Sequence, residues 1–492
     1  MGLCSLALLA CAPKLASEAP GASGVSVAAG APAPAPDPNA AENDRIAEGL
    51  DAYLEAFGEH WGPAFRFNGF VLVTRGDDVV YGRGFGFAEQ GAGAPPDIDT
   101  SFRTGSVTKQ FTAAAILKLQ EQGKLEVTDT VRAHLPAFPM PGAEVTIHQL
   151  LTHTSGVWSY TSDPEIMETR ALPHSVEQML ELFWEKPLDF EPGAEFRYSN
   201  SGYIVLGAIV EAASGMSYGE YLDQELFVPA GMTRTAFGDH TGLSNRAGAY
   251  ERTPSETIVD AGKIHMSVPF AAGGVRSTAR DLWTWHQALE GTSILTESSK
   301  AMLYTTEKND YAYGWVVKPY GGHNVITHSG GIDGFVTEYR RLVDDDIVIV
   351  AWSNTGSPAG DAGRAAMRLA VGEKAPPVEE FEPVPMEPGL GAKVAGRYLL
   401  GDEGRAKLKA MGLPDAAISS FERIAVEQRE GVLSIDPVGQ PKSVVHSKGD
   451  GTFFAKGDNM PGVQFDLPPV GSKAGGLWVL QGPLKIYFER EP

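Results

Sequence analysis

Segments with strand character stand at both ends of one long region, and this placement limits the possible folds most. Two strands joined by a Gly-Asp turn are predicted within residues 69–87, and strand patterns return at 311–317, 324–331, 335–343 and 346–354. The chain between them, to about residue 305, has mostly helical patterns. We therefore predict an α+β fold with an antiparallel sheet flanked by helices and a separate helical subdomain.

Several helices that flank the predicted sheet can be placed from the sequence. In residues 44–57 the apolar side chains recur with helical spacing and define one buried face, formed by Ile46, Leu50, Tyr53, Leu54 and Phe57. A second helix is predicted over 106–122 and a last one at "AGRAAMRLAVG". The "DDD" triplet at 344–346 predicts a hairpin turn between the last two strands.

The composition and residue pattern of the sequence change near the C-terminal end. Residues 374–390 are rich in Pro and Glu and predict a linker between a main domain at 43–373 and a second domain at 391–492. The second domain has short alternating runs separated by turns with Gly and Pro, as in "RIAVEQREGVLSID" and "LWVLQGPLKIYFER". This pattern predicts a small all-β domain, a barrel or a sandwich.

The first residues predict export. Residues 1–15 form an apolar stretch that ends in small residues, and Cys11 in "LLAC" resembles the lipidated cysteine of bacterial lipoproteins. Residues 16–42 are dominated by Ala, Pro, Gly and Ser and predict a disordered tether. We expect a location in the periplasm or cell envelope, with a membrane tether through Cys11; the alternative is an uncleaved apolar tail.

Charge and residue usage exclude several classes of function. The formal net charge of −22 argues against a nucleic-acid partner, because an acidic surface repels phosphate backbones. Cys4 and Cys11 are the only cysteines, so the main domain has no disulfide and no catalytic thiol. The histidines show no metal-binding motif. We expect no metal and no cofactor; the oligomeric state is not predictable.

Ser106 and Lys109 have the spacing of a nucleophile and its activating amine. Residues three apart lie on the same side of a helix, and the apolar run after Lys109 indicates that this helix is buried. A serine hydroxyl needs a nearby base, and a desolvated lysine can be that base. A serine in the first turn also has helix-terminal N–H groups beside it, which can stabilise an oxyanion. Alone, this loose pattern occurs by chance in many proteins.

Two further motifs carry polar groups suited to the same chemistry. Tyr198 and Asn200 precede an amphipathic helix, where a tyrosine can move a proton and an amide can hold a substrate carbonyl or orient Lys109. His328, Gly330 and Gly331 close a predicted strand. Glycines there let a substrate lie against the backbone, and the Gly331 N–H can be a second oxyanion donor. His328 can donate to a substrate carboxylate or join the proton network.

Together the three motifs resemble those of the serine penicillin-recognising enzymes. "SVTK" at 106–109, "YSN" at 198–200 and "HSG" at 328–330 match their S-x-x-K, Y-x-N and K/H-x-G patterns in order and spacing. Over about residues 50–370 the chain is similar to class C β-lactamases, D-alanyl-D-alanine carboxypeptidases, D-aminopeptidases and related esterases. "LLTHTSG" at 150–156 and "YGW" at 313–315 agree with this resemblance.

The resemblance implies a role for each matching residue. Ser106 corresponds to the acylated nucleophile, Lys109 to the lysine that helps to deprotonate it, and Tyr198 to the base that returns the proton to the leaving group. Asn200 corresponds to the residue that binds the substrate amide. His328 stands where many β-lactamases have lysine, which favours the peptidase and esterase branches. The expected substrate is a small molecule or peptide, including peptides with a D-residue, or an ester.

The sequence also allows alternative functions and contains motifs that resemble other active sites. The alternatives to a peptidase or esterase are β-lactamase activity, or a protein that binds cell-wall peptides or β-lactams without turnover or scaffolds an assembly. The G-x-S-x-G pattern at 215–219 follows a helical run, so Gly215 is expected to end a helix. His153 and Ser155 are expected to be structural. The C-terminal domain resembles lipocalin-like domains of some family members; it is expected either to pack or to limit access to the active site.

Overall fold

The computed structural model describes the chain from residue 39 to residue 491, apart from short gaps. The gaps are residues 62–65, 140, 164–165, 167, 240–244, 254–256, 357, 379–383, 411–417, 419–421, 430–431, 438–442, 450, 456–461, 468–472 and 482–483. The predicted export segment at 1–15, with Cys11, and most of the predicted tether lie outside the described residues. Within the described ranges no helix has both the length and the hydropathy that a membrane span requires.

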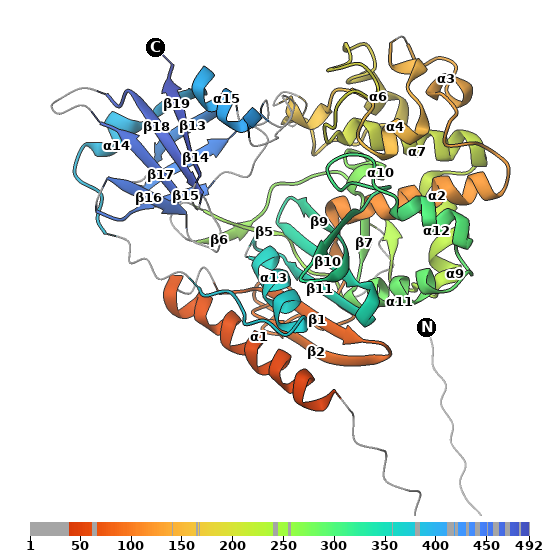
Figure 1. The fold of residues 1–492 in the computed structure, drawn as a ribbon, viewed down its shortest axis with the longest axis horizontal. Coiled ribbons are helices and arrows are strands. Elements are labelled where there is room, and N and C mark those ends of the chain that lie inside the picture. The colour runs from red at the N-terminus through yellow and green to blue at the C-terminus, as the bar shows by residue number, and fades with distance from the viewer. Residues whose placement is uncertain are drawn as a thin grey trace, which may run out of the picture. The chain divides into compact units, whose positions relative to one another are not determined.

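One antiparallel sheet joins the strands from both ends of the main domain. Its spatial order is β2-β1-β11-β10-β9-β8 (Figure 1). The strands are β1 (Gly69–Arg75), β2 (Asp78–Phe85), β8 (Val316–Tyr320), β9 (His323–Ile332), β10 (Phe335–Leu342) and β11 (Ile347–Ser353). The early hairpin is joined to the late strands by the β1–β11 pairing, from Gly69 opposite Ser353 to Arg75 opposite Ile347. The prediction of an antiparallel sheet is confirmed.

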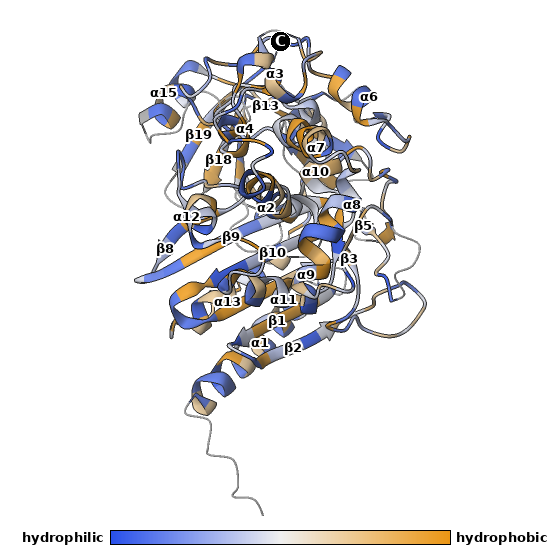
Figure 2. Cartoon of the chain, turned by 90° about the vertical axis from the view of Figure 1, so that its right-hand side faces the viewer, coloured by the Kyte–Doolittle hydropathy of each residue, from blue (hydrophilic) through white to orange (hydrophobic). Residues whose placement is uncertain are grey.

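Alternation along the central strands divides the interior into two cores. Phe70 and Leu72 of β1 contribute to one core, while Val71 and Val73 contribute to the other. Successive side chains of a strand point to opposite faces, so a strand covered on both sides is apolar throughout. The second core is closed by α1 (Ala40–Trp61) and α13 (Ala359–Ala370), and the five predicted core residues of α1 are all buried. Figure 2 shows the hydrophobic colour along β1.

The other core is shared with the helical region. Its helices are α2 (Thr108–Glu121), α3 (Val131–His134), α4 (Ile147–Leu151), α6 (Val176–Glu181), α7 (Asn200–Ser214), α8 (Tyr218–Leu222), α9 (Val228–Ala230), α10 (Phe270–Gly273), α11 (Ala279–Glu290) and α12 (Glu297–Tyr304). Short strands interrupt them: β3 (Phe102–Arg103), β4 (Ala236–Phe237), β5 (Tyr250–Arg252), β6 (Ile258–Asp260) and β7 (Val275–Ser277). The helices α2, α7 and α10 pack on one another and position the site described below.

The predicted strand at 311–317 is wrong for most of its length, since β8 begins only at Val316. Asn309, Asp310 and Gly314 all have positive φ angles, which break an extended run. A Cβ atom on Gly314 would lie 2.7 Å from the carbonyl oxygen of Lys109. The segment therefore turns to pack against the start of α2 and does not continue the sheet.

The C-terminal domain is a closed barrel of eight antiparallel strands in sequence order. They are β12 (Gly396–Leu400), β13 (Arg423–Arg429), β14 (Val432–Pro437), β15 (Ser443–Ser447), β16 (Thr452–Ala455), β17 (Gly462–Asp466), β18 (Gly476–Gln481) and β19 (Leu484–Arg490). β19 pairs with β12, which closes the barrel. The all-β prediction is confirmed, but β15 and the helices α14 (Leu390–Val394) and α15 (Asp402–Ala410) were not predicted. The exact domain boundaries stay predictions.

Candidate active site

Ser106 lies at the entrance of a buried helix. It belongs to a single 3-10 turn, Gly105–Val107, that leads directly into α2. Ser106 is partly exposed, whereas the residues that follow it, from Val107 to Leu117, are buried. Gly105 has a φ angle of +54°, and a Cβ there would lie 2.9 Å from the backbone nitrogen of Gly331. A glycine is needed at this position so that the serine turn and β9 can approach each other.

Lys109 is fully buried directly beside Ser106. Its Nζ atom lies 3.1 Å from Ser106 Oγ, 2.9 Å from Asn200 Oδ1 and 2.7 Å from the carbonyl oxygen of Ala272 in α10. Burial lowers the pKa of Lys109 well below its ordinary value, because the charged form loses its hydration. Among the described residues no carboxylate forms an ion pair with it.

Tyr198 and Asn200 lie at the start of α7, and both contact Lys109. The Tyr198 ring centroid lies 4.8 Å from Lys109 Nζ. Burial raises the pKa of Tyr198 above its ordinary value, while the neighbouring Ser106 hydroxyl opposes that shift. Asn200 accepts from Lys109 through Oδ1 and donates from Nδ2 to Thr161 Oγ1 at 3.1 Å, so its amide orientation is fixed.

The third motif lies along β9, not at its end as predicted, because the strand continues to Ile332. β8 pairs with β9 only as far as Thr327, so the stretch from His328 onward has no strand partner on that side among the described strands. A Cβ on Gly330 would lie 2.0 Å from the carbonyl oxygen of Thr104. A Cβ on Gly331 would meet nothing within 4 Å. The two glycines therefore bring the strand against the serine turn and leave open space beside Gly331.

His328 is present at the site but its two ring nitrogens are occupied. Nδ1 lies 2.6 Å from the carbonyl oxygen of Ser329, which can only accept, so Nδ1 carries the proton. Nε2 then accepts from the Tyr311 hydroxyl at 3.0 Å. Burial and the neighbouring Lys109 lower the pKa of His328 to about 4. The imidazole is thus neutral at neutral pH, and it does not replace the cation of a lysine.

The structure therefore brings all seven predicted site residues into one region, Ser106, Lys109, Tyr198, Asn200, His328, Gly330 and Gly331. Three groups were missed: the Ala272 carbonyl, Thr161 and Tyr311. A main-chain carbonyl is present in every residue, so no residue type marks it, although the glycine pair after Ala272 indicates a close approach of backbones. The sequence pattern places Tyr311 only within a predicted strand.

The misleading serine motif is explained by the helices around it. Gly215 ends α7 with a φ angle of +75°, as predicted. Ser217 caps α8, where its side chain accepts from the backbone N–H of Glu220 and the Glu220 side chain reaches back to it. Such a capping box uses the serine oxygen structurally. Within the described residues no group of three or more His, Cys, Asp or Glu side chains is arranged to hold a metal ion.

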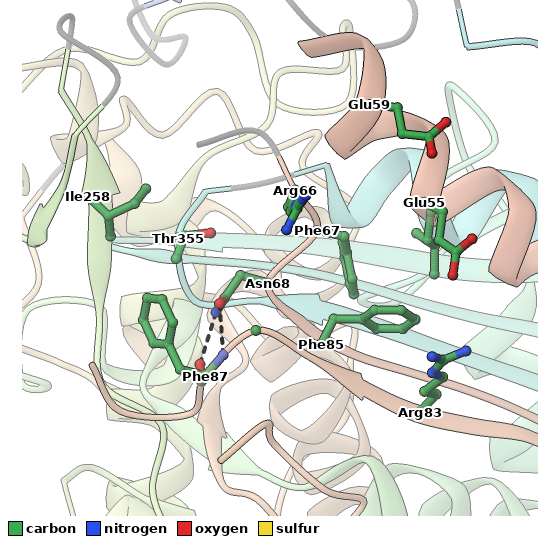
Figure 3. Close-up of a pocket in the computed structure, with 12 residues that line it drawn as sticks. Glu55, Glu59, Arg66, Phe67, Asn68, Arg83, Phe85, Phe87, Ile258 and Thr355 are labelled. Carbon is green, nitrogen blue, oxygen red and sulfur yellow. Dashed lines mark hydrogen bonds between the residues drawn. The ribbon is translucent and has the colours of Figure 1, made fainter. Parts of the chain in front are cut away.

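A separate pocket of about 450 Å³ lies between the end of α1 and the β1–β2 hairpin (Figure 3). Phe67, Phe85 and Phe87 contribute apolar surface, and Arg66 and Glu59 stand at its border. Asn68 in this pocket exchanges hydrogen bonds of 2.9 Å with the backbone of Phe87. No residue of the Ser106 site lines this pocket, so it does not belong to that site.

This fold, with a serine and a desolvated lysine on a buried helix between a helical region and an antiparallel sheet, defines a serine hydrolase of the penicillin-binding and β-lactamase class. The comparisons agree. The Beta-lactamase family model matches residues 51–374, and the chain belongs to this family.

Individual relatives support the same assignment. Penicillin-binding protein 4* of Bacillus subtilis is 32% identical over 327 residues, which cover 61% of this chain and 71% of that protein. The structure of a penicillin-binding protein from Bacillus halodurans superposes with a TM-score of 0.56 and 29% identity, covering 63% of this chain and 97% of that one. A D-stereospecific amidohydrolase from a Streptomyces species gives a TM-score of 0.53 and 25% identity, covering 64% and 94%.

Proposed function

We propose that this protein hydrolyses amide or ester bonds through an acyl-enzyme formed on Ser106. The observation that carries the proposal is the set of partners around Lys109. A neutral amine has two hydrogens and one lone pair. The Asn200 Oδ1 and Ala272 carbonyl oxygens can only accept, so they take the two hydrogens. The lone pair is then directed to Ser106 Oγ, 3.1 Å away, and can accept the hydroxyl proton.

In the proposed acylation, Ser106 Oγ attacks the substrate carbonyl while its proton passes to Lys109. The backbone N–H groups of Ser106 and Gly331, which the two close-approach glycines bring near each other, would stabilise the oxyanion. Tyr198 is a phenol in the resting site because burial raises its pKa. Its hydroxyl can therefore protonate the leaving group when the tetrahedral intermediate breaks down, and recover a proton from the lysine ammonium. Water then releases the acyl group.

The state of His328 supports a substrate without a carboxylate at this position. A neutral imidazole with both nitrogens occupied offers no cation for such a group. We therefore favour amides and peptides, including those with a D-residue, and short esters over carboxypeptidase substrates and β-lactams, which carry a carboxylate. The likeness to a D-stereospecific amidohydrolase supports D-residue amides as the first class to test.

The test is covalent labelling followed by a substrate panel. A fluorophosphonate and a fluorescent penicillin are each incubated with the wild type and with Ser106→Ala. We expect fluorophosphonate labelling that is lost in Ser106→Ala; no labelling of the wild type by either probe would contradict the acyl-enzyme. Stable penicillin labelling without turnover would favour a binding protein. The panel contains D-amino amides, D-Ala-D-Ala peptides, short esters and a chromogenic cephalosporin, and we expect amides or esters to be hydrolysed fastest.

We also propose that the protein is exported and tethered through a lipid on Cys11, as its first residues predict. Metabolic labelling with a clickable fatty acid should mark the full chain but not Cys11→Ser. The Cys4→Ser variant is the matched control, because it removes a cysteine from the same segment. Equal labelling of wild type and Cys11→Ser would contradict the tether.

A further inference from the structure

His153 follows α4 in an unusual backbone conformation. Its φ angle is +57° and its side chain is 1% exposed. Non-glycine residues adopt this conformation at a cost, and the cost is tolerated where the surrounding contacts determine the geometry. The acylation scheme above does not use this histidine, although it is buried beside the site.

His153 holds the backbone on both sides of Tyr198. Its carbonyl oxygen accepts from the N–H of Arg197 at 2.9 Å. Its Nδ1 accepts from the N–H of Ser199 at 3.1 Å. Between these two hydrogen bonds the imidazole ring lies on the Tyr198 ring, with centroids 4.2 Å apart and planes inclined by 38°. One residue thus contacts the main chain before Tyr198, the main chain after it and its ring.

The hydrogen bond from Ser199 also fixes the tautomer of His153. Because Nδ1 accepts, the single proton of the neutral ring is on Nε2. Nε2 is buried and has no hydrogen-bond partner among the described residues. Burial, Lys109 and His328 lower the pKa of His153 well below its ordinary value, so the ring stays neutral and Nδ1 stays an acceptor. The unpaired Nε2–H is unfavourable because it is a buried donor. This cost indicates that the site requires the acceptor at Nδ1, which binds the Ser199 N–H.

We propose that His153 is a positioning residue that holds the Tyr198 side chain beside Lys109 and Ser106 through the hydrogen bond from the Ser199 N–H to Nδ1. This inference rests on the proposed acylation of Ser106. It predicts that the hydrogen-bond acceptor at the Nδ1 position, more than the ring itself, determines how fast the Ser106 proton is transferred through Lys109 and Tyr198.

Two nearly isosteric variants separate the acceptor from the ring. In His153→Asn the amide oxygen occupies the place of Nδ1 and keeps the acceptor, and asparagine tolerates a positive φ angle. In His153→Gln the amide group reaches the place of Nε2 and the Ser199 N–H loses its acceptor. We expect the rate constant of Ser106 labelling to fall about tenfold in His153→Gln and to stay within about threefold of wild type in His153→Asn. The probe's half-saturating concentration should not change.

A double-mutant cycle tests whether His153 acts through Tyr198. In the Tyr198→Phe background, which lacks the hydroxyl, His153→Gln and His153→Asn should label at the same rate. A difference between them that persists in this background, or equal rates in the wild-type background, would overturn the proposal. His286→Asn is the matched control, because His286 is a second buried histidine (2% exposed) bonded to Arg341 and Asp346. We expect it to label at the wild-type rate.

A crystal structure of His153→Gln gives a readout that does not need activity. We expect the Tyr198 ring to have moved from its position 4.8 Å from Lys109 Nζ, and an unmoved ring would overturn the inference. If the wild type itself is not labelled by any probe, the proposed function fails, while this structural comparison still tests the role of His153.

Discussion

Lys109 and Arg341 are basic side chains buried in the same domain, and their surroundings differ. Lys109 is 0% exposed and Arg341 of β10 is about equally buried, at 1% for its side chain. Arg341 donates to the carboxylate of Glu290, to His286 Nδ1 at 2.8 Å and to the Tyr304 hydroxyl. Lys109 has only neutral oxygens as partners. A carboxylate compensates the charge of Arg341, whereas Lys109 has no charged partner among the described residues.

The pKa shifts follow from this difference. Burial alone would lower the pKa of Arg341, but Tyr304, Tyr339 and Glu290 raise it above its ordinary value. For Lys109 burial acts without such compensation and lowers the pKa. A buried cation with a carboxylate stays charged and contributes to the structure, whereas one without a carboxylate becomes a base. This contrast supports the proposed role of Lys109 as the base without reference to any motif.

Replacing Lys109 by methionine gives the largest expected effect on activity. Lys109→Met keeps the length of the side chain and removes the base, so the labelling rate of Ser106 should fall about 10²–10⁴-fold. The free energy of unfolding should change by less than about 2 kcal/mol, because relief of the desolvation cost offsets the two lost hydrogen bonds. Probe kinetics and urea unfolding check both parts. A rate within threefold of wild type would show that Lys109 is not the base.

The same substitution at Arg341 should have the opposite profile. Arg341→Met leaves the buried His286 Nδ1 without its donor, while Glu290, which is 49% exposed, stays hydrated, so the free energy of unfolding should fall by about 1–3 kcal/mol. The labelling rate of the molecules that remain folded should equal that of the wild type. Urea unfolding and labelling below the transition measure these quantities. If Arg341→Met slows labelling as much as Lys109→Met does, the two cations do not differ in the way described.

The neutral state of His328 predicts acid sensitivity. Its pKa is about 4 in the folded protein and about 6.5 when unfolded, so the unfolded state binds more protons between these values. Stability is fully present above pH 6.5, and about 3 kcal/mol is lost as the pH falls to 4. His328→Asn should flatten the dependence of the unfolding free energy on pH in this window. Parallel curves for variant and wild type would contradict the lowered pKa.

Gly105 tests the close packing around the serine turn and has the smallest expected effect. Gly105→Ala combines a positive φ angle with a clash against the Gly331 nitrogen, so unfolding should become easier by about 1–2 kcal/mol and labelling about tenfold slower. Gly123→Ala is a matched control at the other end of α2: φ is +66°, but a Cβ there meets nothing within 4 Å. It should lose stability without slowing the labelling. Equal labelling rates for the two variants would contradict the role of the close approach.

The sequence predicted most of the elements because their patterns are local. The apolar face of α1, the β1–β2 hairpin and the strands β9 to β11 follow from local patterns, and the contact between Ser106 and Lys109 follows from their spacing of three residues at the start of α2. Other features depend on tertiary contacts. The turn at Gly314 exists because it packs on Lys109, and the Ala272 carbonyl enters the site only when α10 docks on α2.

His153 shows why part of the site could not be predicted. Its role depends on a positive φ angle, on two main-chain N–H groups and on a ring contact with a residue 45 positions later in the chain. None of these has a residue pattern, so the sequence supported only a structural role. Likewise β15 pairs with β14 and β16 in the closed barrel, but its residues, Ser443–Ser447, hold two adjacent valines between polar residues, so no alternating pattern marks the strand.

The environment of Lys109 is assembled from α2, α7 and α10, so the state of this lysine changes during folding. Before these three helices meet, the lysine is hydrated and protonated like any other, and the serine three residues earlier is inert. The proposed reactivity of Ser106 therefore arises only when the last of these three helices docks. Under the proposed mechanism, an acylating probe added during refolding should therefore label fully folded molecules and leave compact intermediates unlabelled, so the labelling would report the completion of folding.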